Sequence, residues 1–284
     1  MSASPRQLPP EEFPPLLREI HDPPKTLRAI GDLPRDRRFL TVVGSRKYSP
    51  YGRRCCETLI ASLRSYPVAI VSGLALGIDA LAHEAALKAG LPTVAVLPCG
   101  LSPAVLYPAS NRALAARIVA EGGTLLSEFP DEFKPQQWSF LQRNRIMAGM
   151  SSATLIIETS LRSGTLVTAR LAMECGRDVL TIPFPIDAEN GAGNNSLIRD
   201  GAALIRSADD ILEALQIAPH ERDTAVPDLS PDETAIFNAL SEPLERESLI
   251  ARTDLPAPRA GVALSQLLLK GLIIERMGRI ERII

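Results

Sequence analysis

Three turns rich in glycine and serine follow apolar runs and precede helical patterns. They are Gly44-Ser45-Arg46, the stretch from Ser72 to Asp79 with Gly73 and Gly77, and Ser163-Gly164-Thr165. A turn of small residues before a helix can present bare backbone N–H groups at the positive end of the helix dipole, where phosphates bind. The sequence therefore predicts a surface that receives phosphates, with the chemistry of the chain located there.

Composition limits what kind of anion site this can be. The chain has 284 residues, is 45% hydrophobic and carries a formal net charge of −2. This length allows one large α/β core and a small appended domain. Residues 225–284 contain 7 Lys+Arg against 9 Asp+Glu, and residues 1–224 contain 24 of each. Because the front part is neutral overall, an anion site must be a local patch of cations.

Cysteine and histidine usage argues against a metal or disulfide framework. The four cysteines form no CxxC pair, and the three histidines are far apart along the chain: Cys55, Cys56, Cys99, Cys175, His21, His83 and His220. No apolar run reaches the roughly 20 residues of a membrane span, and none before Phe39 fits a signal peptide. We expect a cytoplasmic protein without a metal.

The pattern changes at Phe39, which divides the front of the chain. Residues 1–38 are charged and contain three Pro-Pro pairs, so we expect a Pro-rich N-terminal arm or the remnant of a lost domain. Residues 39–217 alternate apolar strand candidates with amphipathic helical stretches, which is typical of a mostly parallel, Rossmann-like sheet covered by helices on both faces. The strand candidates are 39–43, 68–71, 93–97, 124–127, 154–158 and 179–183.

The end of the chain reads as a second, smaller domain. Residues 218–228 contain prolines and several charges and form the expected linker. Residues 229–284 then predict three short helices at 231–240, 246–251 and 259–270, followed by a hairpin of 272–276 and 279–283 around Met277-Gly278. Three helices and a two-stranded hairpin are the pattern of a winged-helix domain.

The residues that follow the first two strands carry the first binding hypothesis, because ligands of open parallel sheets bind at the carboxyl ends of the strands. Arg46 offers a guanidinium that can hold a phosphate in a bidentate manner, beside the hydroxyl of Ser45. A tight turn with a solvated arginine is the alternative. The glycines at 73 and 77 do not match the dinucleotide pattern GxGxxG, and packing of a helix on the sheet could explain one of them.

A second group of candidates lies in the stretch from Ser139 to Ile146. Phe140 stands beside Arg143 and Arg145, and an aromatic ring with nearby arginines is how proteins hold single strands without sequence preference. Alternatively, Phe140 belongs to the core and one arginine is a structural ion-pair partner. Glu158, after the fifth strand, is either that partner or a catalytic acid if the protein is an enzyme.

Taken as a set, the motifs resemble one known family. The segments that carry the resemblance are Val43–Arg46, Ser72–His83, Tyr107-Pro108, Ser127–Pro130, Arg143–Ile146, Glu158, Ser163–Ala169, Gly176-Arg177 and Asn195–Ala202. Over about residues 39–215 they are similar to DNA-processing protein A, also called DprA or Smf, and the C-terminal segment is similar to the winged-helix appendage of that family.

The resemblance implies a function and a set of partners. It implies a cytoplasmic, ATP-independent homodimer that binds and protects incoming single-stranded DNA in natural transformation. It also implies that the protein loads the RecA recombinase onto DNA coated by single-stranded DNA-binding protein, without a cofactor and without catalytic residues of its own.

The resemblance also assigns roles by position. Ser45 and Arg46 would hold phosphate, Ser72, Gly73 and Gly77 would line the same pocket, and Phe140 would stack on a base. The supporting positions would be Arg143 and Arg145 in the groove, Arg162 before Ser163 and Gly164, and Arg112 on an extended basic path.

The sequence departs from the family at three places. Leu141 stands where the family has proline after the stacking aromatic, and Phe184 stands where it has glycine. Gln137 replaces a basic residue, for which Lys134 is the nearest substitute.

Two other function classes remain as alternatives. Rossmann-like enzymes that bind nucleotides or cleave nucleoside monophosphates carry a Pro-Gly-Gly turn and a downstream glutamate, whereas this chain has Arg162-Ser163-Gly164 and Ala169 at the comparable places. A transcription regulator would read duplex DNA through its winged helix. The expected recognition helix, 259–270, has only Arg259 and Lys270 as basic residues, so it fits a protein contact better.

Overall fold

The chain forms two compact units. The computed structural model describes residues 4–218, 229–240, 242–270, 272–276 and 278–282. One unit comprises Met1–Pro219 and the other His220–Ile284. Most of the expected linker 218–228, and Met277 of the expected hairpin turn, lie outside the described residues.

A nine-stranded sheet forms the larger unit in the described part of the chain, in the order β1-β2-β6-β5-β4-β3-β7-β8-β9. The strands from β3 to β9 pair in parallel, and β1 and β2 add an antiparallel edge beside β6. The expected Rossmann-like, mostly parallel sheet is confirmed. Its parallel strands are β3 (Arg38–Val43), β4 (Val68–Ser72), β5 (Thr93–Val96), β6 (Thr124–Ser127), β7 (Ala153–Ile156), β8 (Asp178–Thr181) and β9 (Ala203–Leu204).

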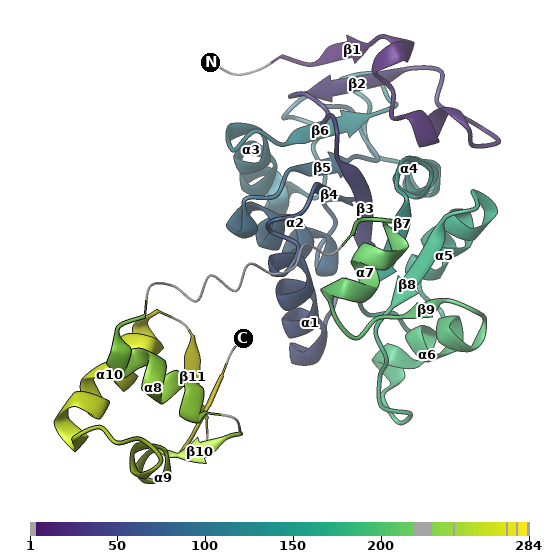
Figure 1. Ribbon diagram of the computed structural model, residues 1–284. Coiled ribbons are helices and arrows are strands. Elements are labelled where there is room, and N and C mark those ends of the chain that lie inside the picture. Colours follow the sequence, from purple (N-terminus) through teal and green to yellow (C-terminus); the bar gives the residue numbers. More distant parts are fainter. Residues whose placement is uncertain (1–3, 219–228, 241, 271, 277, 283–284) are drawn as a thin grey trace. The chain divides into compact units, whose positions relative to one another are not determined.

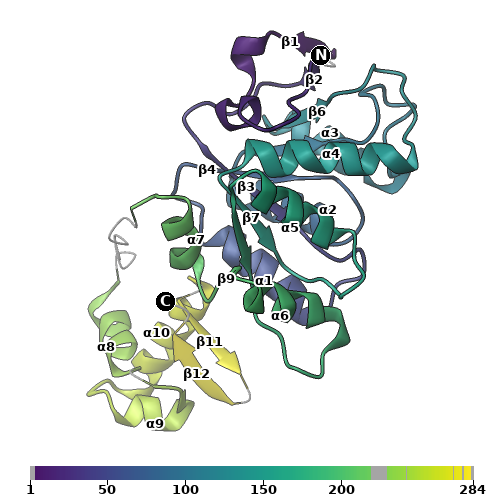
Figure 2. The same ribbon diagram turned by 90° about the vertical axis from the view of Figure 1, so that its right-hand side faces the viewer.

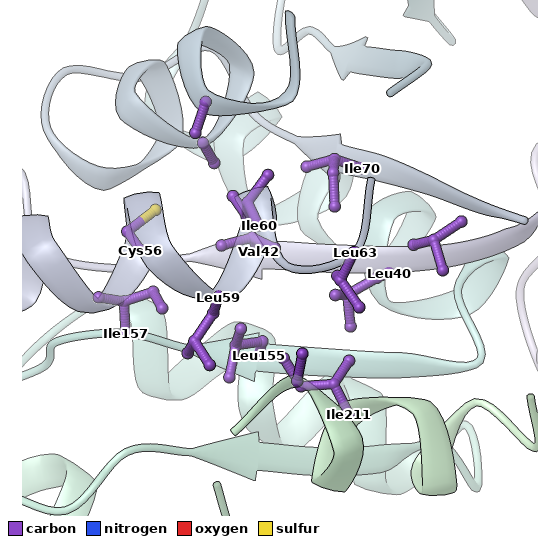
Figure 3. Packing of buried hydrophobic residues seen from close by; sticks show 14 of the residues in the cluster. Leu40, Val42, Cys56, Leu59, Ile60, Leu63, Ile70, Leu155, Ile157 and Ile211 are labelled. Carbon is purple, nitrogen blue, oxygen red and sulfur yellow. The ribbon is translucent and has the colours of Figure 1, made fainter. Parts of the chain in front are cut away.

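Helices cover both faces of this sheet (Figures 1 and 2). On one face lie α1 (Pro50–Ala61), α2 (Ile78–Ala89) and α7 (Ala208–Ala214), and on the other α4 (Gln137–Met150) and α5 (Thr165–Glu174). Side chains of β3 alternate between the two cores, with Leu40 and Val42 in the first and Phe39 and Val43 in the second. Figure 3 shows the first core, in which Leu59 and Ile60 of α1, and Leu63 just after that helix, pack on β3 and β7. The remaining helices are α3 (Arg112–Ala120) and α6 (Ala192–Arg199).

The N-terminal segment is part of the larger unit, so the expected arm is wrong. Strand β1 (Arg6–Leu8) pairs with β2 (Leu27–Ile30), and β2 pairs with β6 at the sheet edge. Between them, short 3-10 turns at Pro10–Glu12 and Pro15–Arg18 begin at the proline pairs. Leu17 is fully buried in the core beneath α4. The prolines therefore shape tight turns, with their fixed φ angle, rather than prevent packing.

The smaller unit is a winged helix, as expected. It contains α8 (Pro231–Ala239), α9 (Arg246–Ala251) and α10 (Ala257–Leu269), with strands in the order β10-β12-β11. The hairpin strands are β11 (Ile273–Arg276) and β12 (Arg279–Arg282), and the sequence reading missed the two-residue strand β10 (Leu244–Glu245). Apolar residues of all three helices and of the hairpin, such as Ile236, Leu249, Leu264 and Ile280, form its core.

Candidate nucleic-acid interface

The carboxyl ends of β3, β4 and β5 surround a small surface pocket. Arg46 comes after β3, Gly73 after β4, and Phe140 from the first turn of α4. The full lining is Arg46, Gly73, Ala75, Leu76, Pro98, Tyr107, Pro108 and Phe140. The structure thus brings together an arginine and an aromatic ring that are 94 positions apart in the numbering, both of which were predicted to bind the strand.

The aromatic side of the pocket consists of two rings. The rings of Phe140 and Tyr107 meet edge to face, with centroids 5.6 Å apart and an interplanar angle of 84°. Phe140 is half-buried, and Tyr107 is 42% exposed. Phe140 is absent from the hydrophobic core, so the alternative that it is a core residue is wrong. The sequence offers Tyr107 only as part of a Tyr-Pro motif. Its place beside Phe140 follows from the three-dimensional arrangement and could not be predicted from the sequence.

The cationic side of the pocket is Arg46. Its side chain is exposed, and within the described residues it has no hydrogen-bond or ion-pair partner. An unpaired guanidinium keeps all five N–H donors available for a phosphate. Together with the adjacent rings, it can hold one nucleotide by its phosphate and by its base.

Arg143 supports the floor of the pocket from below. Its side chain is 4% exposed, and its Nη1 donates to the backbone oxygen of Val96 at 2.7 Å. A Cβ added to Gly73 would lie 1.7 Å from that Nη1, so only glycine leaves room for the guanidinium. Burial lowers the pKa of Arg143 and raises the pKa of nearby Asp79. The opposite charges of the two side chains partly offset both pKa shifts. Arg143 is therefore a positioning residue and does not face the solvent.

Gly77 brings two of the predicted turns together. It adopts a φ of +86°, and a Cβ there would lie 2.2 Å from the backbone oxygen of Ser45. The same oxygen accepts a hydrogen bond from the amide of Ile78 at 3.1 Å. The turn before α2 is thereby tied to the turn that carries Arg46.

Glu158 fills the crevice where the order of the strands reverses, between β3 and β7. Its carboxylate is fully buried and accepts hydrogen bonds from the amide of Ser49 at 3.0 Å, the hydroxyl of Ser49 at 2.6 Å and Nδ2 of Asn190 at 3.0 Å. All of these donors are neutral, so the expectation that Glu158 pairs with an arginine is wrong. The crevice that holds nucleotides in many doubly wound sheets contains a carboxylate here.

One amide near the start of each of three helices is bonded within the protein, so the expectation of bare N–H groups does not hold for these amides. In the first turn of α1, the amide of Gly52 donates to Oγ of the N-cap residue Ser49 at 3.0 Å. Before α2, the amide of Gly73 donates to Asp79 Oδ2 at 3.2 Å. At the first residue of α5, the amide of Thr165 donates to Ser163 Oγ at 3.1 Å. What lines the pocket for a ligand is the side chains of Arg46 and Phe140.

Several predicted residues hold the structure together. Ser72 is buried and its hydroxyl donates to Val42 O at 2.6 Å, whereas the Ser45 hydroxyl donates to Lys47 O at 2.7 Å. Arg145 is an ion-pair partner, as in the structural alternative: its Nη2 donates to Oε1 of Glu128 at 2.5 Å and to Oε2 at 2.7 Å. Arg112 is exposed, but it donates to Ala104 O at 3.0 Å.

The other predicted residues are accessible but lie outside the pocket lining. Lys134, Arg162 and Gly164 are exposed, and Ser163 is partly exposed. The two cations have no ion-pair partner among the described residues. They can extend a cationic path, but they do not form the pocket itself.

The described residues contain neither a metal-binding cluster nor a membrane-spanning helix. No group of three or more His, Cys, Asp or Glu residues in this part of the chain is arranged to hold a metal ion. Within the same residues, no helix has the length and apolar character that crossing a bilayer requires.

Comparison with known proteins identifies the family. A family model described as DNA recombination-mediator protein A matches residues 8–216. The chain belongs to this family. The model of the DprA winged helix domain matches residues 219–279. The match to the first model begins at residue 8, which agrees with the packed N-terminal segment.

Similar proteins and structures agree with the family. Protein Smf of Escherichia coli is 38% identical over 277 residues, covering 96% of this chain and 74% of its own, and DprA of Bacillus subtilis is 38% identical over 207 residues, covering 72% and 69%. The crystal structure of DprA from Streptococcus pneumoniae superimposes with a TM-score of 0.68 at 38% identity and covers 73% of each chain. DprA from Helicobacter pylori, whose structure concerns its single-stranded DNA binding mode, gives 0.67 at 30% identity, covering 76% of this chain and 98% of that one.

Proposed function

We propose that this protein binds single-stranded DNA at the carboxyl ends of β3, β4 and β5. The observation that carries the proposal is the meeting of Arg46 and Phe140 in one pocket over Gly73. A guanidinium for the phosphate and a ring for the base hold a strand without reading its sequence. The net charge of −2 is compatible with this, because the binding cations are local.

The same proposal assigns a role in recombination. The protein protects incoming single strands during natural transformation and loads RecA onto strands coated by single-stranded DNA-binding protein. It acts as a homodimer in the cytoplasm and catalyses no reaction. Membership of the recombination-mediator family and the likeness to a DprA structure described by its single-stranded DNA binding mode support this assignment.

A nucleotide-cleaving enzyme is the weaker candidate. Glu158 is the residue considered as a catalytic acid, and it is fully buried with its oxygens hydrogen-bonded to Ser49 and Asn190. A general acid or base must reach the proton that it transfers. Ala169, where related enzymes have a glutamate, is buried in α5 and has no titratable group.

Recognition of duplex DNA by the winged helix is likewise a weaker candidate than single-strand binding. Arg259 of α10 pairs with Asp232 at 2.6 Å, and Lys270 pairs with Glu233 at 2.7 Å. Cations already paired within the domain contribute little to a phosphate contact, because the pair must be broken first. We assign the winged helix to a protein contact.

Binding is tested by fluorescence anisotropy with labelled oligo-dT, a mixed-sequence single strand and a duplex of the same length. We expect tight binding of both single strands, weaker binding of the duplex, and no displacement by AMP or NAD. Displacement by either nucleotide would favour the enzyme. RecA loading is tested separately, by the rate of RecA-dependent strand exchange on coated DNA with and without the protein.

A further inference from the structure

Helix α4 presents a second aromatic ring close to the pocket but outside it. Trp138 is the sole tryptophan of the sequence, and 52% of its side chain is exposed. Leu141, one turn further along the same helix, is 53% exposed. Single exposed apolar residues are common on protein surfaces, so the arrangement around Trp138 decides whether it is a site.

Two phenylalanines hold the indole in place. The rings of Phe129 and Phe133 are stacked 4.5 Å apart, and each lies 5.7 Å from the ring of Trp138 at a steep angle. Because the two phenyl rings are closer to each other than to the indole, they meet it from one side. The other side is left to solvent. An aromatic ring fixed in this way loses little conformational entropy when a base stacks on it.

Helical geometry connects Trp138 to the pocket. Successive side chains of a helix are about 100° apart. Ser139 points inward, since it is fully buried and its hydroxyl donates to Pro98 O at 2.6 Å. Trp138 and Phe140 therefore flank that inward direction, and Leu141 lies between them on the outer side. We call Phe140, Leu141 and Trp138 the α4 ridge.

The charges around the ridge suit a polyanion. The sequence from Lys134 to Ile146 contains no aspartate or glutamate. Lys134 is exposed and has no ion-pair partner among the described residues. Three acidic residues lie just before this stretch. Glu128 pairs with Arg145 at 2.5 Å and Asp131 pairs with Arg28 at 2.6 Å, whereas Glu132 is exposed and has no ion-pair partner among the described residues.

We propose that single-stranded DNA continues from the pocket around the first turn of α4 and stacks a further base on Trp138, with Lys134 near the backbone. The α4 ridge would thus form a second stacking platform of the same binding surface. This inference rests on the proposed function, because it extends the strand that Arg46 and Phe140 bind. Continuity with that pocket and the absence of aspartate and glutamate from residues 134–146 favour a nucleic acid over a protein partner.

The experiment uses Trp138 as its own probe, since the full chain contains no other tryptophan. Oligo-dT is titrated into the protein while intrinsic tryptophan fluorescence and the anisotropy of a labelled strand are followed in parallel. We expect quenching that saturates together with binding. Trp138→Leu keeps an apolar side chain but removes the ring system, and it should weaken binding at least about fivefold. Trp138→Phe should stay within about twofold of the parent protein.

A control and the contrary outcomes separate this inference from the proposed function. Ile186→Ala removes a fully exposed apolar side chain elsewhere in the same unit and should leave affinity unchanged. Tight binding without quenching, or with unchanged affinity of Trp138→Leu, overturns the second platform and leaves the proposed function intact. If neither the parent protein nor any of the variants binds the strand, the proposed function itself is overturned. Quenching that follows protein concentration alone, with association seen by light scattering, identifies the ridge as a contact between copies and overturns the inference.

Discussion

Arg46 gives the sharpest test of the binding surface. Its guanidinium is exposed and has no hydrogen-bond or ion-pair partner in the described part of the chain, so Arg46→Ala removes a cation without breaking a hydrogen bond or an ion pair. A charge-assisted contact to phosphate in a solvent-exposed site is worth roughly a tenfold change in affinity. We expect this loss for oligo-dT and for mixed sequences alike, because a phosphate carries no sequence information.

The salt dependence supplies a second, independent magnitude. Removing one phosphate contact to a single strand should reduce the slope of log affinity against log salt by about 0.7. Between about 50 and about 200 mM salt, the ratio of parent to variant affinity should therefore shrink about threefold. Anisotropy titrations at four salt concentrations measure both quantities.

The matched control is Arg35→Ala. Arg35 is also exposed and has no ion-pair partner among the described residues, but it lies before β3, at the opposite end of the strand that Arg46 follows. Its removal should change neither the affinity nor the slope. An Arg46→Ala variant with the slope of the parent protein would refute the reasoning, whatever its affinity at one salt concentration.

Three further outcomes follow from the fold. Gly73→Ala should lower the free energy of unfolding by more than about 2 kcal/mol, measured in urea, and weaken strand binding, because the new Cβ displaces the Arg143 guanidinium. The control is Gly164→Ala, which has nothing within 4 Å of its Cβ position and should change neither stability nor binding. Burial holds the pKa of His83 down to about 3, below its unfolded value, so the contribution of His83 to stability is fully present above about pH 6.5. The free energy of unfolding should fall by about 2 kcal/mol from pH 7 to pH 5, and the pH profile of His83→Gln should be flatter. Deleting residues 225–284 should keep strand affinity within about threefold by anisotropy, and its abolition would assign binding to the winged helix.

The sequence predicts the six longer parallel strands well, because they are largely buried and so appear as nearly continuous apolar runs. The seventh, β9, was missed because it has only two residues and both are exposed. Each of the six expected strands is present with ends shifted by at most a few residues. Strands β1 and β2 were missed because they are short, lie at an antiparallel edge and flank proline pairs. A local pattern cannot show that Leu17, between those pairs, enters the core beneath α4.

At the site, residue types were easier to predict than residue roles. Arg46 and Phe140 were recognised as chemistry-bearing groups, and the structure places both in one pocket. Arg143 looked equally suited to phosphate, but its bond to Val96, 47 residues away, decides that it is buried. Similarly, the donors that surround Glu158 come from positions 109 residues before and 32 residues after it. Such long-range partners are fixed by topology, which sequence periodicity does not record.

The carboxylates of Glu158 and Asp79, buried at the starts of α1 and α2, have a consequence for ligand choice. Amides near the starts of these helices, which could otherwise bind an anion, donate to the two carboxylates instead. In the pocket, a single mononucleotide can therefore contact the Arg46 guanidinium and the aromatic rings. Modest contacts of this kind become effective when many are linked along one polymer, since each raises the local concentration of the next. We therefore expect the protein to bind long single strands tightly and small cellular phosphates only weakly.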